Sequence, residues 1–373
     1  MAPPIEVNFG RSAPFSLGVE EELQLVSAET YDLVSRYDEI AEAADDERVK
    51  PELMQSTAEV ATGIAGNVAE AMAQVAELRQ RVAAAAIERG ARIASAGTHP
   101  FARWEDQEIT DADRYASLVE RMQWVAEREL IFGLHVHVGL PSGDAAIHVG
   151  NALRTWIPEL LALSANSPFW QGRDTGLASA RSTIFDSFPR SGLPPTFDSW
   201  EEFELLVERG ARTNSFPDYT YIWWDVRPHP RLGTIEIRAC DAQTRLESVA
   251  ALVALVQSLV ATLADRFERT GRLPTEMIML IAENKWRAAR YGLDADLIWL
   301  ERDEERPARA ALAELLELAL PAARRLGCEA ELGEVEAICA RGTGADEQRR
   351  VRHRADSLLA VAQWLVEQTV DPV

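Results

Sequence analysis

The segment from Gly18 to Val26, GVEEELQLV, has the alternating pattern of a β-strand. Successive side chains of a strand point to opposite faces, so one face is apolar except for Glu21 and the other carries Glu20, Glu22 and Gln24. The two carboxylates on the polar face lie about 6.5 Å apart at the usual rise per residue. Like charges this close repel, so the fold has to expose them to water or neutralise them with cations. On the apolar face, Glu21 needs a basic partner, and we expect an arginine from a covering helix.

Four further segments that are predicted as strands also carry acids, imidazoles or guanidiniums on one face. The opposite face of each segment is apolar and suited to packing against helices. The polar residues are Glu59 in 57–64, His135 and His137 in 131–140, and Arg227, Glu236 and Arg238 in a predicted hairpin of 221–227 with 233–241. One such strand would mean little, but several together indicate that one face of a sheet lines a site.

The residue types on this face indicate the chemistry of the site. Carboxylate oxygens with an imidazole favour Mg²⁺ or Mn²⁺, whereas zinc sites use more nitrogen or sulfur. Arginines among these acids suit phosphate oxygens, which a guanidinium binds in a forked geometry. The residues therefore predict a metal-dependent phosphoryl-transfer site on an open sheet. Any nucleotide is bound without a P-loop or a Rossmann glycine fingerprint, because the sequence contains neither.

Charge and cysteine usage exclude several classes of protein. The net charge is −22, from 38 basic and 60 acidic residues, which argues against nucleic acid or an anionic membrane as the main partner. The three cysteines have no CxxC spacing, which indicates a reducing compartment. The first residues have no apolar segment typical of a signal peptide, and no apolar run approaches the length of a membrane span. We therefore expect a cytoplasmic protein.

The order of the predicted elements indicates the fold class. Strands and helices mix through residues 15–241 without strict βαβ alternation, which favours antiparallel pairing. From residue 245 onward every segment reads as helical, including one long helix over 346–368. We predict an α+β fold in which helices cover one face of a mostly antiparallel sheet. The 373 residues are expected to form a single catalytic domain, with a helical part (242–373) packed on the sheet-containing core (15–241).

Seven motifs in the order found here closely resemble the type-2 glutamate–cysteine ligase family, also called carboxylate–amine ligases, over residues 15–292. They are GVEEEL (18–23), GTHPF (97–101), HVHVG (135–139), ANSPFW (165–170), WWDVRPH (223–229), GTIEIR (233–238) and ENKWRAARYG (283–292). The resemblance implies a glutamine synthetase-like fold, in which the antiparallel sheet curves into a half-barrel with helices outside. It also implies an ATP-dependent ligase that phosphorylates a carboxylate, typically the side-chain carboxylate of glutamate. An amine, cysteine in the family's name, then attacks the acyl phosphate and forms an amide.

The same resemblance implies roles for individual residues. Those similar to the family's metal ligands are Glu20, Glu22, Glu59, His135 and Glu236. Arg238, and less strongly Arg227, resemble arginines that meet phosphate, so with His135 they are the expected catalytic residues. Lys285 is expected either to reach ATP or to lie on a solvated helix face. His137 occupies a position that often holds an amide in the family and is expected to influence substrate preference.

The loop at 166–195 is rich in Gly, Ser, Pro and Arg, and its aromatic residues favour an ordered active-site loop. From their charge and position, Arg173 and Arg181 in this loop are expected to bind substrate carboxylates. Two other functions stay open: a metal-dependent hydrolase that uses a metal-bound water, and a ligand-binding homologue without catalysis. The intact set of carboxylates argues against loss of catalysis. The substrates are expected to be small amino acids or amines, and a homodimer is possible.

Overall fold

Strand β1 (Leu17–Ser27) lies at the centre of a seven-stranded sheet in the computed structural model, which describes residues 5–302 and 304–370. The strand order is β10-β11-β5-β1-β3-β2, β4 also pairs with β1, and every pairing in this sheet is antiparallel. The other strands are β2 (Val49–Pro51), β3 (Thr57–Ala61), β4 (Ala91–Ala94), β5 (Gly133–Gly139), β10 (Val226–His229) and β11 (Thr234–Asp241). The predicted α+β fold with a mostly antiparallel sheet is confirmed.

The register of the sheet brings the predicted polar residues onto one face. Residues directly opposite each other on neighbouring strands point to the same side of the sheet. The opposed positions are Glu20 with His135, Glu22 with Glu59, His137 with Glu236, and Arg227 with Glu236. Apart from Glu21, the residues between them, which point to the opposite face of the sheet, are apolar and almost completely buried. The strand alternation read from the sequence thus separates the site from the core.

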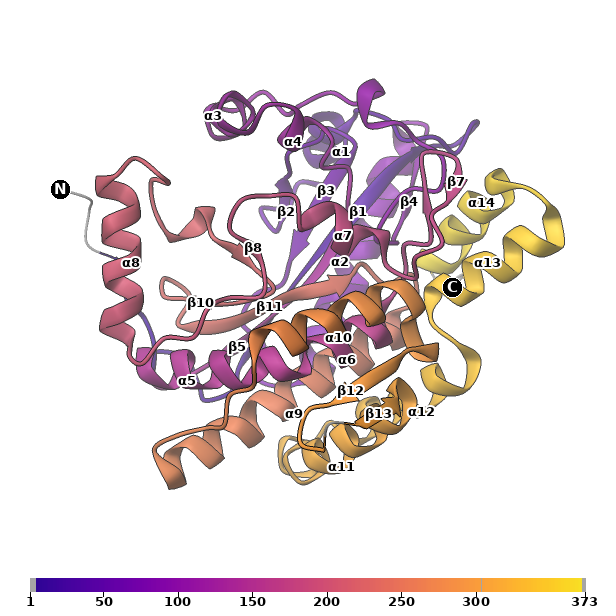
Figure 1. Cartoon of the computed structure of the whole chain (residues 1–373). Coiled ribbons are helices and arrows are strands. Elements are labelled where there is room, and N and C mark those ends of the chain that lie inside the picture. The colour runs from indigo at the N-terminus through magenta and orange to yellow at the C-terminus, as the bar shows by residue number, and fades with distance from the viewer. Residues whose placement is uncertain (1–4, 303, 371–373) are drawn as a thin grey trace.

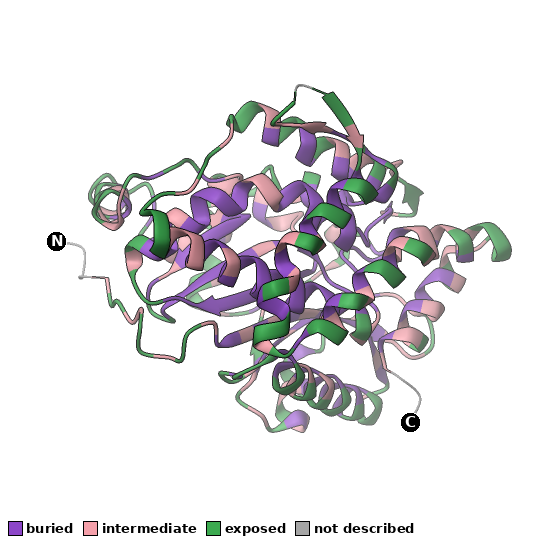
Figure 2. Ribbon diagram, turned by 90° about the horizontal axis from the view of Figure 1, so that it is seen from below, coloured by how far each residue is buried: buried purple, intermediate pink, exposed green. Residues whose placement is uncertain are grey.

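Helices cover the apolar face of the sheet (Figure 1). One continuous core joins apolar residues of β1, β5 and β11 to α2 (Val68–Glu88), α5 (Gly143–Leu153), α6 (Ile157–Ser164), α9 (Leu246–Thr270), α11 (Ala308–Leu326) and α12 (Glu329–Arg341). Helix α9 is long and apolar enough to span a membrane, but 78% of its most apolar window is buried inside the protein. Figure 2 shows the same division, with buried strands and with helices that are exposed on their outer sides. The single catalytic domain stays a prediction.

The remaining helices lie around this core. They are α1 (Tyr37–Ala44), α3 (Asp113–Met122), α4 (Trp124–Glu127), α7 (Ala180–Phe185), α8 (Trp200–Arg212), α10 (Ile278–Tyr291), α13 (Gly344–Ala355) and α14 (Leu358–Thr369). The predicted helix over 346–368 is therefore two helices. Asp356 adopts a left-handed conformation with φ of 49° and ends α13, and Ser357 caps α14. An αL residue cannot continue a right-handed helix.

The prediction that every segment after residue 245 is helical is wrong at one place. Strands β12 (Asp296–Trp299) and β13 (Glu304–Pro307) form an antiparallel hairpin between α10 and α11. Each strand has only four residues, too few for the alternation of polar and apolar side chains to stand out. Leu297 is completely buried and packs in a small cluster with residues of α6, α10 and α11, so the hairpin closes the end of this helical layer.

A buried ion pair ties the central strand to the helices behind it. Glu21 is completely buried on the apolar face of β1, and Arg79 of α2 donates to its two carboxylate oxygens at 2.9 and 2.7 Å. The guanidinium of Arg79 also donates to the carbonyl oxygens of Gln243, Thr244 and Thr369. The arginine expected from a covering helix is thus Arg79, and it joins four separate segments of the chain.

Replacing Arg79 with methionine is expected to lower the free energy of unfolding by about 3–5 kcal/mol, because it leaves the Glu21 carboxylate buried without a partner. Urea denaturation followed by circular dichroism measures the change. The double variant Glu21→Leu with Arg79→Met removes both charges and is expected to recover much of this loss. A single variant as stable as the wild type would contradict the structural importance of the pair.

Candidate active site

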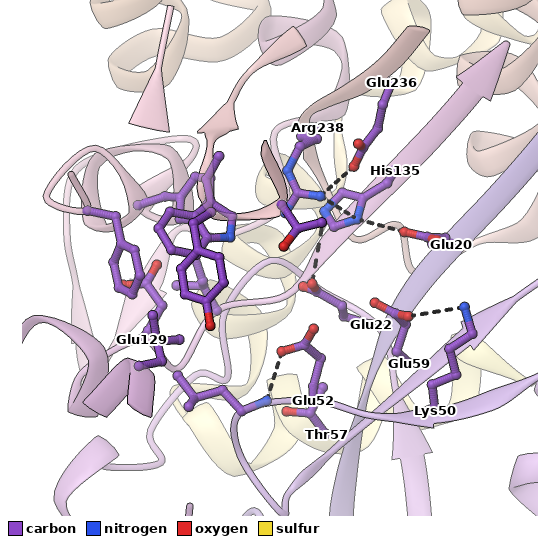
Figure 3. A pocket seen from close by; sticks show the side chains of 18 of the residues that line it. Glu20, Glu22, Lys50, Glu52, Thr57, Glu59, Glu129, His135, Glu236 and Arg238 are labelled. Atoms are coloured by element: carbon purple, nitrogen blue, oxygen red, sulfur yellow. Dashed lines mark hydrogen bonds and ion pairs between the residues drawn. The ribbon is translucent and has the colours of Figure 1, made fainter. Parts of the chain in front are cut away.

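A cavity of about 470 Å³ opens over the polar face of the sheet. Strands β1, β3, β5 and β11 provide its floor, and residues of α3, α7 and β9 (Trp223–Trp224) line its sides. The predicted site residues that line it are Glu20, Glu22, Glu59, His135, His137, Arg181, Arg227, Glu236 and Arg238. Figure 3 shows how the carboxylates from several strands converge. The structure therefore brings together all the predicted site residues except Arg173 and Lys285.

The first group of possible metal ligands is formed by Glu20, His137 and Glu236, whose ligand atoms lie within 4.8 Å of one another. Nδ1 of His137 lies 3.0 Å from the hydroxyl of Thr234, which fixes the ring. Nε2 of His137 then lies 3.6 Å from a carboxylate oxygen of Glu20 and 3.9 Å from one of Glu236. This Nε2 is buried and has no hydrogen-bond partner within the described part of the chain. The structure thus places His137 among possible metal ligands, and its influence on substrate preference stays a prediction.

The second group of possible metal ligands contains only carboxylates, those of Glu22, Glu52 and Glu59. Burial raises the pKa of Glu52 to about 7, and the charge of Glu22 contributes to the increase. Burial also raises the pKa of Glu59 well above its ordinary value, with further increases from the neighbouring carboxylates. Three acids this close cannot all be ionised at low cost unless a cation lies among them.

Both groups fit a divalent metal by the chemistry of their donor atoms. Oxygen-rich sets with at most one imidazole suit hard cations such as Mg²⁺ and Mn²⁺. Burial lowers the pKa of His135, and Arg238 lowers it further, so this ring is neutral near pH 7. Burial alone would also lower the pKa of His137, but Glu236 and Glu20 raise it above its ordinary value, so a metal at the first group competes with a proton on this ring. Nδ1 of His135 lies 3.5 Å from Glu20, and its Nε2 lies 3.9 Å from Glu22, so His135 bridges the two groups.

Glu236 holds two arginines against the floor of the cavity. The Nε of Arg227 donates to one of its oxygens at 2.6 Å, and Nη1 of Arg238 donates to the other at 2.5 Å. Burial alone would raise the pKa of Glu236, but the two guanidiniums lower it well below its ordinary value. The ionised carboxylate fixes the positions of both cations beside the acidic groups. This arrangement suits phosphate oxygens, which need positive charge in a fixed geometry.

Two predicted residues lie elsewhere. Lys285 of α10 is buried, and its ammonium lies 2.8 Å from Asp186 and 2.8 Å from Asp225. It is neither on a solvated helix face nor on the wall of the cavity; instead, it ties the residue after α7 to the sheet. Arg173 is exposed on β7 (Arg173–Asp174), in a small hairpin with β6 (Phe169–Trp170). The geometry thus does not support a contact of Lys285 with ATP or of Arg173 with substrate.

The loop at 166–195 is ordered, as expected, and one acid organises it. The carboxylate of Asp241 is completely buried and accepts hydrogen bonds from the Asn166 amide and from the hydroxyls of Ser167 and Ser179. The hydroxyl of Ser167 in turn accepts from the backbone amide of Arg181. This network sets the start of α7, so that Arg181 points toward the sheet.

Sequence reasoning missed several residues that line the cavity. The acids are Glu52 and Glu129, and the others include Arg114, Tyr115, Phe185, Phe188, Tyr221 and Trp223. Glu52 follows a three-residue edge strand, and Glu129 lies in the connection between α4 and β5, so neither had strand alternation to indicate its direction. Burial raises the pKa of Glu129 to about 8. The aromatic residues of the loop at 166–195 were the only local sequence feature that indicated this side of the cavity.

The sequence matches the family described as glutamate–cysteine ligase family 2 over residues 16–367. The chain belongs to glutamate–cysteine ligase family 2. A relative from Rubrobacter xylanophilus, whose name reads "Putative glutamate--cysteine ligase 2-3", is 48% identical over 98% of this chain and 100% of its own length. A second relative, "Putative glutamate--cysteine ligase 2" from Solibacter usitatus, is 43% identical over 95% of this chain and 93% of its own length.

A solved structure shows the same fold at low sequence identity. The glutamate–cysteine ligase of Francisella tularensis, in complex with AMP, has a TM-score of 0.69 and 14% identity, with 97% of this chain and 90% of that chain covered. Membership of glutamate–cysteine ligase family 2 identifies the protein as an ATP-dependent carboxylate–amine ligase, which forms a C–N bond. Enzymes of this family use ATP with a divalent metal, and their substrates are amino acids.

Gly133 at the start of β5 leaves room for the guanidinium of Arg181. A Cβ atom at residue 133 would overlap with Nη2 of Arg181 and would lie 2.8 Å from Nε2 of His135. Both atoms are ends of side chains, so the fold can adapt while the guanidinium moves. We expect Gly133→Ala to lower kcat/KM by about tenfold or more, which is about 1.4 kcal/mol, with a nearly unchanged urea midpoint.

The matched control is Gly333→Ala in α12, where nothing lies within 4 Å of the added Cβ. This variant is expected to keep full activity and to gain a few tenths to about 1 kcal/mol of stability, because alanine favours a helix over glycine. Steady-state kinetics and urea denaturation of the two variants check both statements. Full activity in Gly133→Ala would show that the position of Arg181 does not matter for the reaction.

Proposed function

We propose that the enzyme activates the γ-carboxylate of glutamate as an acyl phosphate and joins it to a primary amine, giving an amide, ADP and phosphate. One observation carries this proposal. A single cavity contains both groups of possible metal ligands and an arginine pair that is fixed by Glu236. A carboxylate resists attack by an amine because it is a poor electrophile, and phosphorylation gives it a leaving group. The chain thus has to neutralise phosphate charge and orient two substrates.

The reaction proceeds in two displacements. An oxygen of the γ-carboxylate attacks the γ-phosphorus of ATP, and the bond to the ADP oxygen breaks. The amine then attacks the acyl carbon, phosphate leaves, and the amine loses one proton. Each step develops or moves negative charge on oxygen, so positive groups that are already in place lower the barrier.

The residues of the chain have separate tasks in this proposal. Arg238 and Arg227 bind phosphate oxygens, and Glu236 keeps both guanidiniums from moving away. Divalent cations, with Mg²⁺ the proposed species, would be held by Glu20, His137 and Glu236 and by Glu22, Glu52 and Glu59, and when bound would neutralise the phosphate oxygens. His135 lies between the two groups and keeps the carboxylates of Glu20 and Glu22 apart.

Cysteine is the first amine to test, because it is in the family's name and in the names of the relatives. The lining residues include several aromatic side chains, so a panel of larger amines belongs beside it. A cytoplasmic location and a homodimer stay predictions.

The test is phosphate release from ATP with Mg²⁺ or Mn²⁺ across pairs of amino acids and amines, including glutamate with cysteine. We expect release that depends on both substrates, and a loss of about 100-fold or more in Glu20→Ala and in Arg238→Ala. Arg173→Ala removes an arginine outside the cavity and is expected to keep full activity. Metal-dependent hydrolysis without ATP would support the hydrolase, and substrate binding without any turnover would support a binding protein.

A further inference from the structure

Unpaired polar atoms gather at one part of the cavity wall. Both carboxylate oxygens of Glu129, the Nε of Arg181 and the Nε2 of His135 are buried and lack a hydrogen-bond partner within residues 5–302 and 304–370. All three residues line the cavity. A buried polar group without a partner is costly, so folds pair such groups unless another task prevents it. Binding of a ligand that supplies the missing partners is such a task.

The backbone on both sides of Glu129 is fixed. The amide of Glu129 donates to the carbonyl oxygen of Ala126 in α4, and the amide of Phe132 donates to that of Gly97. Leu130 and Phe132 are completely buried in a hydrophobic cluster. The side chain of Glu129 is therefore presented to the cavity by a rigid segment, although this segment is only a connection between a helix and a strand.

Neither nearby cation is bound to Glu129. The guanidinium of Arg128 lies over the ring of Trp124 at 4.3 Å. That of Arg181 donates to the carbonyl oxygens of Arg238 at 3.2 Å and Ala239 at 3.5 Å, which leaves its Nε free. The charges of both arginines still act on Glu129. An acid and an arginine thus face one cavity without forming an ion pair with each other in the described part of the chain.

We infer that Glu129 and Arg181 form the subsite that recognises the α-ammonium and α-carboxylate groups of the carboxylate-donating amino acid. A carboxylate suits a primary ammonium, and a guanidinium suits a carboxylate, so the pair matches a zwitterion at both ends. The inference rests on the proposed function, because it concerns the substrate of that reaction. It makes Glu129 a specificity-determining residue.

The position of this subsite explains which carboxylate reacts. A Cβ on Gly133 would touch both Arg181 and His135, so the two side chains lie against the same point of β5. Nε2 of His135 in turn lies 3.9 Å from a carboxylate oxygen of Glu22, which belongs to the second group of possible metal ligands. An amino acid held by its α-groups at Glu129 and Arg181 therefore directs its side-chain carboxylate toward His135, Glu22 and Arg238. In this pose the α-carboxylate stays bound to Arg181, and Arg227 and Arg238 are left to meet phosphate.

The experiment compares L-glutamate with glutarate, which lacks only the α-ammonium group. Isothermal titration calorimetry measures binding of each compound, and steady-state kinetics measures kcat/KM for each as donor at saturating ATP and amine. Wild type is expected to prefer L-glutamate by about tenfold or more, since one charge-assisted hydrogen bond is lost with glutarate. Glu129→Gln keeps the size of the side chain, and we expect it to remove most of this preference. Its KM for ATP is expected to stay within about twofold of the wild-type value.

Two further variants complete the design. Glu127→Gln removes an acid two residues away that does not line the cavity, and it is expected to keep the wild-type preference. Arg181→Lys is expected to reduce discrimination against 4-aminobutanoate, which lacks the α-carboxylate, while it keeps discrimination against glutarate. Thermal unfolding of each variant separates loss of fold from loss of recognition.

Each outcome decides the inference. A Glu129→Gln variant that weakens both donors equally, or that keeps the preference for L-glutamate, overturns it. A variant with an increased KM only for the amine assigns Glu129 to the acceptor and also overturns it. If wild type couples no donor to any amine, the proposed function fails; the two binding constants then test the subsite by themselves, and equal binding of L-glutamate and glutarate to wild type overturns the inference.

Discussion

The ion pair between Glu21 and Arg79 is the interaction on which the site depends. Three glutamates follow one another in β1, and strand geometry sends the middle one into the core, where a lone charge would be costly. Arg79 neutralises it and fixes which face of the strand is inside. A shift of one residue would exchange the faces, so this pair also keeps Glu20 and Glu22 directed into the cavity, opposite His135 and Glu59.

In the cavity, by contrast, several negatively charged side chains lie close together. At Glu236 the protein itself balances the negative charge, because two arginines share this one carboxylate. Around Glu22, Glu52 and Glu59 it does not: burial, together with the charges of neighbouring carboxylates, raises the pKa values of Glu52 and Glu59. The difference separates a part of the site that the chain has organised by itself from a part that needs a cation. An enzyme that binds phosphate and metal together benefits from both, since a preformed arginine pair costs no reorganisation during the reaction.

Much of the site was predictable because the side-chain period of a strand is a local property. Glu20, Glu59, His135, Glu236 and Arg238 were each placed by the alternation within a few residues, and the sheet register did the rest. Glu52 and Glu129 lie where no such period exists, so only the folded chain brings them to the cavity. Lys285 shows the opposite case: a motif pointed to it, but its partners, Asp186 and Asp225, come from segments 99 and 60 residues away. Local sequence patterns likewise did not indicate the break at Asp356 or the short hairpin after α10. They also allowed the class of partner for Glu21 to be predicted, but not which arginine it is.

The contacts of Arg79 also bear on how the chain reaches this fold. The guanidinium joins residues that are 58, 164, 165 and 290 positions away in the sequence. Closing such long loops costs entropy before any of these hydrogen bonds can form. The central strand therefore gains its full support only when helices from the last third have already docked. We expect the sheet and the helical layer to fold cooperatively, with the burial of Glu21 among the late events.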